Sequence, residues 1–224
     1  MLPFGKKHML HYSRCVTCVA LMIKPIFNNS TGFIIPSAVS FTREKILTHA
    51  FEIIRREGIS ALSARKIAQE LECSTRPVYS AYNSRQELHE AVISIAREFA
   101  LTYFVQRQES TDPVFLTLGL RYYQFSQDEP ALFRLLFLEG KIGISLEQLG
   151  RPFVSLLGNL AQDANFEGLD EAAGKQIATN MWIYTHGLVA INSCAPIKNA
   201  EPIIRENLIQ MGRTLFESQK RKTS

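Results

Sequence analysis

Residues 63–82 read SARKIAQELECSTRPVYSAY, and this stretch decides how we expect the chain to fold. A helix-turn-helix unit needs a small residue where its helices cross, apolar residues that hold the crossing angle, and a turn residue that tolerates unusual dihedrals. Counted from Ala64, positions 4, 5, 8, 10, 15 and 18 of the unit meet these needs: Ile67, Ala68, Leu71, Cys73, Val78 and Ala81. The spacing therefore predicts two short helices, one after Ser63 and one after Ser74, joined by a tight turn.

Further helices are predicted on both sides of this unit. Before it, Thr42 is a suitable N-cap and Gly58 a suitable stop for a helix. After it, Ser84 and Glu87 have the spacing of a capping box, in which each side chain bonds the other's backbone amide. Apolar residues recur at helical spacing within both segments, as Ile46, Ala50 and Ile54 and as Leu88, Val92, Ile95 and Phe99.

The second half of the sequence is predicted to form longer, more apolar helices, which proline and glycine separate. We place these helices at about 112–127, 130–138, 145–164, 169–193 and 200–219. Strand-like alternation of useful length is not found. The expected fold is therefore all-α with about nine helices: a three-helix helix-turn-helix domain at 41–104, then a helical bundle at 105–224, behind a leader at 1–40.

Charge does not by itself point to nucleic acid. The net charge of +4 lies entirely in the leader, which has four Lys or Arg residues and no acid, while 41–105 sums to +1 and 106–224 to −1. We interpret the leader as a flexible arm or an over-long annotated start, because the only small-residue cleavage site, Ala38-Val39-Ser40, lies far beyond its apolar run. That run, Cys15 to Ile23, is too short to cross a bilayer.

The cysteines predict neither disulfides nor a metal site. Four irregularly spaced cysteines suit a reducing cytoplasm. His8, His11, Cys15 and Cys18 are zinc-ligand types, but such close spacing leaves no loop to surround a tetrahedral ion. We expect no cofactor or metal.

The helix predicted after Ser74 has an outward face rich in donors and planar groups: Ser74, Thr75, Arg76, Tyr79 and Tyr82. A short helix of this kind can enter the DNA major groove, which is about 12 Å wide, and present its first side chains to base edges. The alternative is that these residues only cover the surface of a small helical domain.

Four motifs follow one another from Thr42 to about Phe104: a first helix ending in Gly, Ser-x-Arg-x-Ile-Ala, Tyr-x-x-Tyr, and Ser-Arg-x-Glu-Leu. In this order they resemble the N-terminal domain of tetracycline-repressor-type (TetR family) regulators, which have Tyr-x-x-Phe at the third motif. The resemblance implies DNA binding. It implies phosphate contacts by Ser63 and Arg65, base or phosphate contacts by Ser74, Thr75, Arg76 and Tyr79, backbone contact by Tyr82, and a phosphate contact by Arg85, where the family usually has Lys.

Two departures from the family pattern affect this interpretation. Glu72 stands at the turn position where Gly is usual, so either it adopts a left-handed conformation or the turn differs. Arg76-Pro77 replaces the usual pair of small residues, so the base specificity does not follow from the resemblance.

The resemblance further implies a homodimer with an inducer pocket in the second domain. Residues 181–187 resemble the Trp-(three residues)-His-Gly signature of one C-terminal subgroup. Trp182 and His186 are i, i+4 neighbours that can line one cavity, although aromatic stripes at helical spacing are usually core. The candidate pocket residues are Trp182, His186, Phe115, Tyr122, Phe133 and Phe137. The last two helices are apolar on more than one face and are the expected dimer interface.

These features predict a homodimeric, cytoplasmic transcriptional regulator, by default a repressor, that binds a palindromic operator and is released by a small molecule. An enzyme is disfavoured, because hydrolase, phosphate-loop, metal-helix and dinucleotide motifs are missing from the sequence. The alternative left open is a helical protein-protein adaptor with a vestigial DNA-binding unit.

Overall fold

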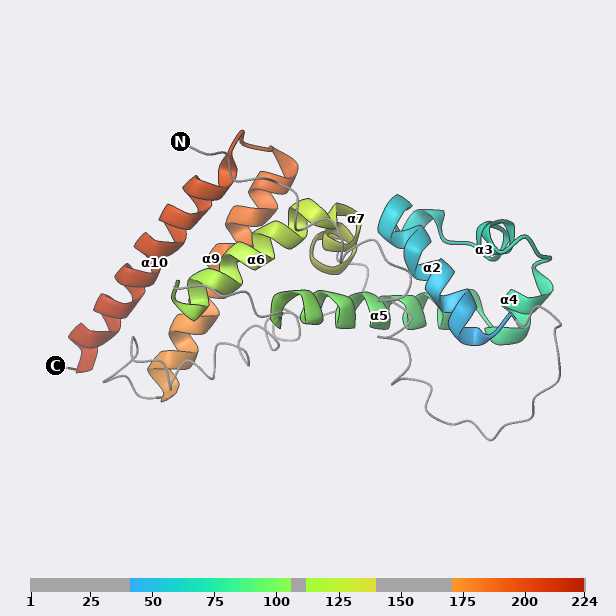
Figure 1. Cartoon of the computed structure of the whole chain (residues 1–224). Helices are drawn as coiled ribbons and strands as arrows, with labels where there is room; N and C mark the ends of the chain where they lie inside the picture. Colours follow the sequence, from blue (N-terminus) through green and yellow to red (C-terminus); the bar gives the residue numbers. More distant parts are fainter. Residues whose placement is uncertain (1–40, 106–111, 140–170, 224) are drawn as a thin grey trace. The chain divides into compact units, whose positions relative to one another are not determined.

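A computed structural model describes residues 41–105, 112–139 and 171–223 (Figure 1). By its internal contacts the chain divides into two units, one ending at Phe99 and the other beginning at Ala100. The leader, with its histidines and cysteines, and the helix predicted at 145–164 lie outside the described residues.

Helical segments of different lengths make up the described part of the first unit, and hydroxyl side chains begin three of them. The elements are α2 (Arg43–Glu57), η2 (Ile59–Ala61), α3 (Ala64–Glu70), α4 (Arg76–Ala81) and α5 (Arg85–Val105), of which α5 continues into the second unit. The Oγ1 of Thr42 accepts from the Lys45 amide at 3.2 Å, and the Oγ of Ser63 from the Lys66 amide at 3.1 Å. The predicted stop of α2 is confirmed, since Gly58 adopts φ 85°.

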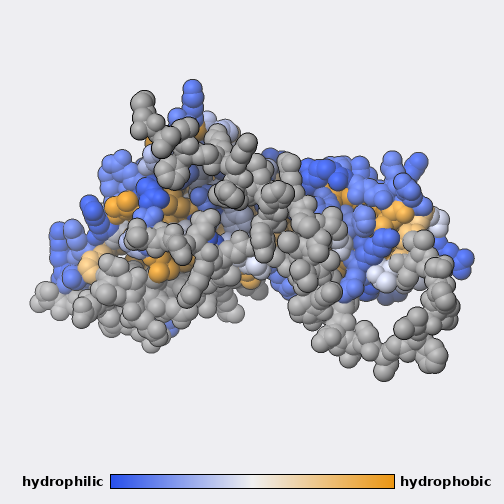
Figure 2. Space-filling model, viewed as in Figure 1, coloured by the Kyte–Doolittle hydropathy of each residue, from blue (hydrophilic) through white to orange (hydrophobic). Residues whose placement is uncertain are grey.

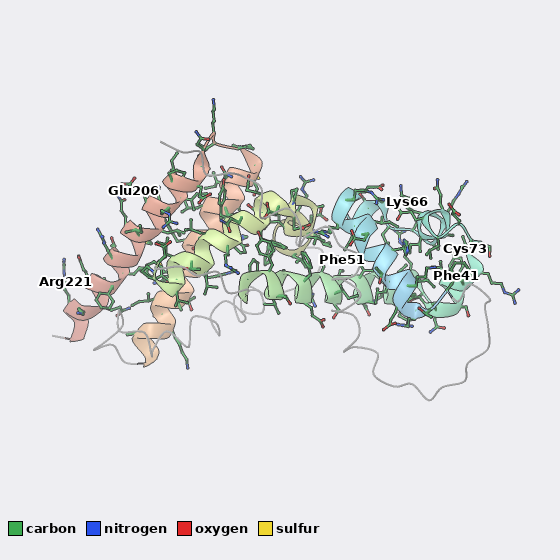
Figure 3. The ribbon with its side chains drawn as sticks, viewed as in Figure 1. Phe41, Phe51, Lys66, Cys73, Glu206 and Arg221 are labelled. Carbon is green, nitrogen blue, oxygen red and sulfur yellow. The ribbon has the colours of Figure 1, made fainter. Side chains whose placement is uncertain are left out.

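The turn between α3 and α4 takes one of the two forms that the sequence allowed. Glu72 has φ 52°, so this non-glycine residue does adopt the left-handed conformation. The amide of Cys73, labelled in Figure 3, donates to the carbonyl of Ala68 at 2.9 Å. α4 begins at Arg76, slightly later than predicted, with Pro77 in its first turn, where the missing N–H breaks no helical bond.

The core of the first unit is apolar and aromatic. The rings of Phe51 and Phe99 lie 5.5 Å apart between their centroids, and both side chains are buried. Val78 turns inward from α4, and Ile67 and Ala68 from α3. On the face visible in Figure 2, hydrophilic residues predominate over α2 to α4, with smaller apolar patches between them.

Beyond the end of α5, five helical segments lie in the described part of the second unit. They are α6 (Val114–Asp128), α7 (Pro130–Phe133), the π-helical η3 (Arg134–Leu138), α9 (Glu171–Cys194) and α10 (Ala200–Thr223), and α6, α9 and α10 pack against one another (Figure 1). A Cβ on Gly119 of α6 would lie only 2.7 Å from Cδ1 of Leu208 on α10, so the Leu208 side chain would have to move to admit one. The predicted helices at 112–127, 130–138, 169–193 and 200–219 are confirmed within a few residues, although η3 replaces most of the second.

The described residues contain no strand and no helix long and apolar enough to cross a membrane. The all-α class expected from the sequence is confirmed.

Candidate functional site

Arg76 and Tyr79 on the outward face of α4, together with Ser74 and Thr75 just before the helix, are four of the side chains proposed to meet DNA. Ser74 and Arg76 are exposed, Thr75 is half-buried, and Tyr79 is 64% exposed although its ring is large and apolar. An exposed ring on a short helix is available to stack on or pack against a partner. Ser63 and Arg65, at the start of α3, are also exposed.

A cleft of about 330 Å³ lies beside this face, between the starts of α3 and α5. It is lined by four of the predicted residues, Ser63, Tyr79, Tyr82 and Arg85. Ser60 and Ser84, which the sequence analysis assigned no role in DNA binding, add hydroxyl groups to the same cleft. Hydroxyls, a guanidinium and the N-terminus of a long helix in one hollow form a suitable setting for a phosphate group.

The placement of Tyr82 on the outward face is wrong. Its side chain is 2% exposed, and its hydroxyl lies 3.5 Å from the backbone carbonyl of Arg43. Tyr82 follows Val78 by four residues, so both point to the inner side of α4. Burial raises the pKa of the Tyr82 phenol to about 12.

Arg43, to which the sequence analysis gave no role, contacts the far end of α4. Its Nη1 donates to the carbonyl of Ala81, its Nη2 donates to Oε1 of Glu87 at 2.8 Å, and its guanidinium lies 4.1 Å from the centroid of the Tyr82 ring. The hydrogen bond from Arg43 holds the pKa of the Glu87 carboxyl below its usual value, and the amide of Asn83 adds to this.

The predicted capping box at the start of α5 is half formed. The Glu87 amide donates to Oγ of Ser84 at 3.0 Å, as expected. The Glu87 carboxylate, however, accepts from the amide of Asn83 at 2.8 Å instead of from that of Ser84. Glu87 is thereby shared between the link before α5 and Arg43.

A neutral polar cluster lies in the second unit. The Tyr122 hydroxyl is 2.9 Å from Nδ1 of His186, and the rings of His186 and Trp182 stack with centroids 5.7 Å apart. Burial lowers the pKa of His186 and raises that of Tyr122, so both side chains are neutral at pH 7. The indole Nε1 of Trp182 is buried and has no hydrogen-bond partner among the described residues.

Five of the six candidate pocket residues meet in this cluster. Phe133 and Phe137 pack on the Tyr122 ring with centroid distances of 5.2 and 5.1 Å. Phe115 lies elsewhere, against Gly212 of α10, where a Cβ would approach its ring to 3.0 Å. Phe104, in the last turn of α5, joins the cluster instead, 5.7 Å from Tyr122.

Comparisons with known proteins support the fold. Neither a family model nor a curated protein matches the sequence. The structure matches the crystal structure of a Rhodococcus sp. protein provisionally described as a TetR-family transcriptional regulator, with a TM-score of 0.56 and 20% sequence identity, over 79% of this chain and 100% of that one. The chain has a TetR-type fold.

The TetR-type fold agrees with the motif order between Thr42 and Phe104 from which the resemblance was drawn. At 20% identity the likeness concerns the fold and not the operator or the ligand. Within the described residues no group of three or more His, Cys, Asp or Glu side chains is placed to bind a metal ion.

Proposed function

We propose that the chain is a transcriptional regulator of the TetR type that binds DNA through α4. The observation that carries this proposal is the exposed face of Ser74, Arg76 and Tyr79 beside a cleft that contains Arg85. Such a face can lie in the major groove, where Arg76 is the residue able to make a bidentate contact with guanine.

Contacts with phosphate would flank the base-reading face. Ser63 and Arg65 at the start of α3, Thr75 before α4, and Arg85 at the start of α5 are our candidates. The positive end of the α5 dipole supports Arg85 in this role. Tyr82 is no longer a candidate, because it is buried.

We propose that the protein works as a homodimer through α9 and α10. These helices leave apolar side chains in water: Ile183 is 47%, Ile191 64% and Ile203 47% exposed. Two helices from each protomer would cover these residues in a four-helix interface. A two-fold dimer would present α4 twice, which suits a palindromic operator.

We place a DNA-binding domain at 41–104 and a ligand-binding domain at 105–224. A small molecule that binds in the second domain would release the repressor from DNA. The Tyr122, His186 and Trp182 cluster is our candidate pocket, with Phe133 and Phe137 as apolar walls. Support comes from the buried indole N–H of Trp182, which offers a ligand an unused donor. As a regulator of transcription the protein would act in the cytoplasm.

Selection of duplexes from a random pool tests this function. We expect the purified chain to enrich one palindromic sequence. Arg76→Ala should bind that sequence no better than a scrambled duplex, whereas Arg85→Ala should bind all duplexes more weakly, with a salt slope smaller by about one. Arg97→Ala, which removes an exposed charge from α5, is the matched control.

Two outcomes would contradict the proposal. Weak, sequence-blind binding that salt abolishes would favour the protein-protein adaptor. Equal affinity of Arg76→Ala and the parent for the selected duplex would remove Arg76 from the base-reading face.

A further inference from the structure

Arg43 is the first residue of α2, yet its side chain reaches three groups around the end of α4. The guanidinium donates to the Ala81 carbonyl and to the Glu87 carboxylate, and it covers the Tyr82 ring. Ala81 and Tyr82 end α4, and Glu87 lies in the first turn of α5. A single side chain therefore joins α2, α4 and α5.

The helix α4, which Arg43 contacts, has few stabilising interactions of its own. α4 spans Arg76–Ala81, has no side-chain cap at its N-terminus, and buries only Val78 within its span. Helices this short are unstable in isolation, and the carbonyls of their last turn lack intrahelical donors. The bond from Arg43 satisfies one of these carbonyls and places a cation at the negative end of the helix dipole.

Glu87 fixes Arg43 in place. The carboxylate accepts from Arg43 at 2.8 Å through Oε1, while Oε2 accepts from the amide and the side-chain Nδ2 of Asn83 at 2.8 and 3.1 Å. Asn83 lies in the link between α4 and α5. The end of α4, the link and the start of α5 thus form one hydrogen-bonded network around Arg43.

We infer that Arg43 is the positioning residue for the recognition helix, setting the orientation in which α4 presents Arg76 and Tyr79 to DNA without itself contacting the duplex. This inference rests on the proposed function. The Arg43 guanidinium already donates to two oxygen acceptors and covers a ring face, so its main partners are intramolecular. The Arg43 side chain is 38% exposed.

The test compares Arg43→Met with Arg55→Met in the full chain. Arg55 is also on α2, where its guanidinium lies 5.0 Å from the Phe99 ring centroid and its Nη1 lies 3.7 Å from Glu52. The two arginines are about 18 Å apart along the helix, so both variants lose the same charge but only one loses the contact with α4. Arg43→Lys and Glu87→Gln are milder variants that test the same network if Arg43→Met does not fold.

Binding is measured to the selected duplex and to a scrambled duplex of the same composition, over a range of salt. For Arg43→Met we expect affinity for the selected duplex to fall at least about tenfold, the loss typical of one charge-assisted hydrogen bond. Affinity for the scrambled duplex and the salt slope should equal those of Arg55→Met. Arg43→Lys should recover part of the loss, because it keeps the charge beside Glu87.

Amide hydrogen exchange without DNA gives a second measurement that does not depend on the proposed function. We expect the α4 amides Tyr79 to Tyr82 to exchange faster in Arg43→Met and Glu87→Gln, while the amides of α2 stay as protected as in Arg55→Met. Unchanged exchange in α4 would overturn the positioning role. If the parent enriches no duplex, the proposed function fails, and exchange alone decides the role of Arg43.

Two binding results would also overturn the inference. A salt slope lower by about one than that of Arg55→Met would mean that Arg43 neutralises a phosphate directly. Equal losses of affinity for the selected and scrambled duplexes would mean that Arg43 contributes only charge.

Discussion

The two units are stabilised differently at the places described above. In the unit that ends at Phe99, charged and hydroxyl side chains near the surface bind the helix ends. In the unit that begins at Ala100, buried neutral side chains form the candidate site. Arg43 pairs with Glu87 at 2.8 Å and Lys66 with Glu57 at 3.0 Å in the first unit. In the second, the Tyr122 hydroxyl meets His186 at 2.9 Å within a cluster of aromatic rings.

This difference indicates which conditions each unit tolerates. Surface ion pairs weaken with salt and acid, but water replaces them at little loss of free energy. Buried neutral contacts are insensitive to salt, but any change in volume or loss of a partner is felt strongly. Substitutions among the buried groups of the second unit should therefore affect stability more than substitutions at the surface of the first unit, and changes of pH should act mainly through the surface ion pairs.

The largest effect is expected from Phe125→Ala in the second unit. Phe125 is 0% exposed, and its ring meets those of Tyr103 and Phe104 edge-on at 5.2 and 5.3 Å. The cavity should lower the free energy of unfolding by about 3 to 5 kcal/mol, measured in urea. Tyr79→Ala, at an exposed ring of the first unit, should change it by less than about 0.5 kcal/mol. Similar losses of unfolding free energy for both variants would contradict the expected difference between the buried and the exposed ring.

Tyr122→Phe should have the next largest effect. It removes the hydroxyl that meets His186 and keeps the ring, so the free energy of unfolding should fall by about 1 to 2 kcal/mol. The matched control is Tyr184→Phe, whose half-buried hydroxyl donates to Asn207 at 3.1 Å and which should lose less. Equal losses would show that burial of the Tyr122 hydroxyl has no influence.

Acid should weaken the first unit through Glu87. The folded-state pKa of this carboxyl lies below its ordinary value of 4.5, so the unfolded chain binds its proton first as the pH falls. The stabilisation by the Arg43 pair is therefore complete above pH 4.5 and is lost as the pH falls through the lowered pKa. Urea unfolding between pH 6 and pH 3 should show a smaller dependence on pH for Glu87→Gln than for the parent. Parallel curves of unfolding free energy against pH for Glu87→Gln and the parent would contradict this prediction.

The smallest effect is expected at the turn between α3 and α4. Glu72 has φ 52°, and Glu72→Gly should raise the free energy of unfolding by about 0.5 kcal/mol, since relief of left-handed strain exceeds the added flexibility of glycine. Asn199, with φ 55°, is the control, because asparagine tolerates this conformation and Asn199→Gly should gain nothing. A destabilised Glu72→Gly would mean that its side chain supports the turn.

Local signals made much of the fold predictable. Thr42, Ser63 and Ser84 mark helix starts within three residues of the amides that they cap, so the sequence carries this information directly. Proline and glycine marked the helix ends of the second half in the same way. The π-helical turn at η3 was not predicted, because apolar periodicity does not distinguish it from an α-helix.

The contacts of the candidate sites were less predictable, because they are not local. Arg43 lies 38 residues from Ala81 and 44 from Glu87, and Tyr122 lies 64 from His186. Tyr82 was misplaced since tyrosine suits both an exposed face and a core with one polar contact. Only its position four residues after Val78 could have indicated burial.

The division of the chain within α5 has a consequence for recombination between related genes. Phe99 and Ala100 are neighbours inside one helix, and not in a linker that would absorb length changes. One inserted residue there would turn the direction of Phe104 by about 100° relative to that of Val92 and lengthen the helix by about 1.5 Å. Chimeras joined at this point should tolerate an insertion of about seven residues, which is close to two full turns, better than a single added residue.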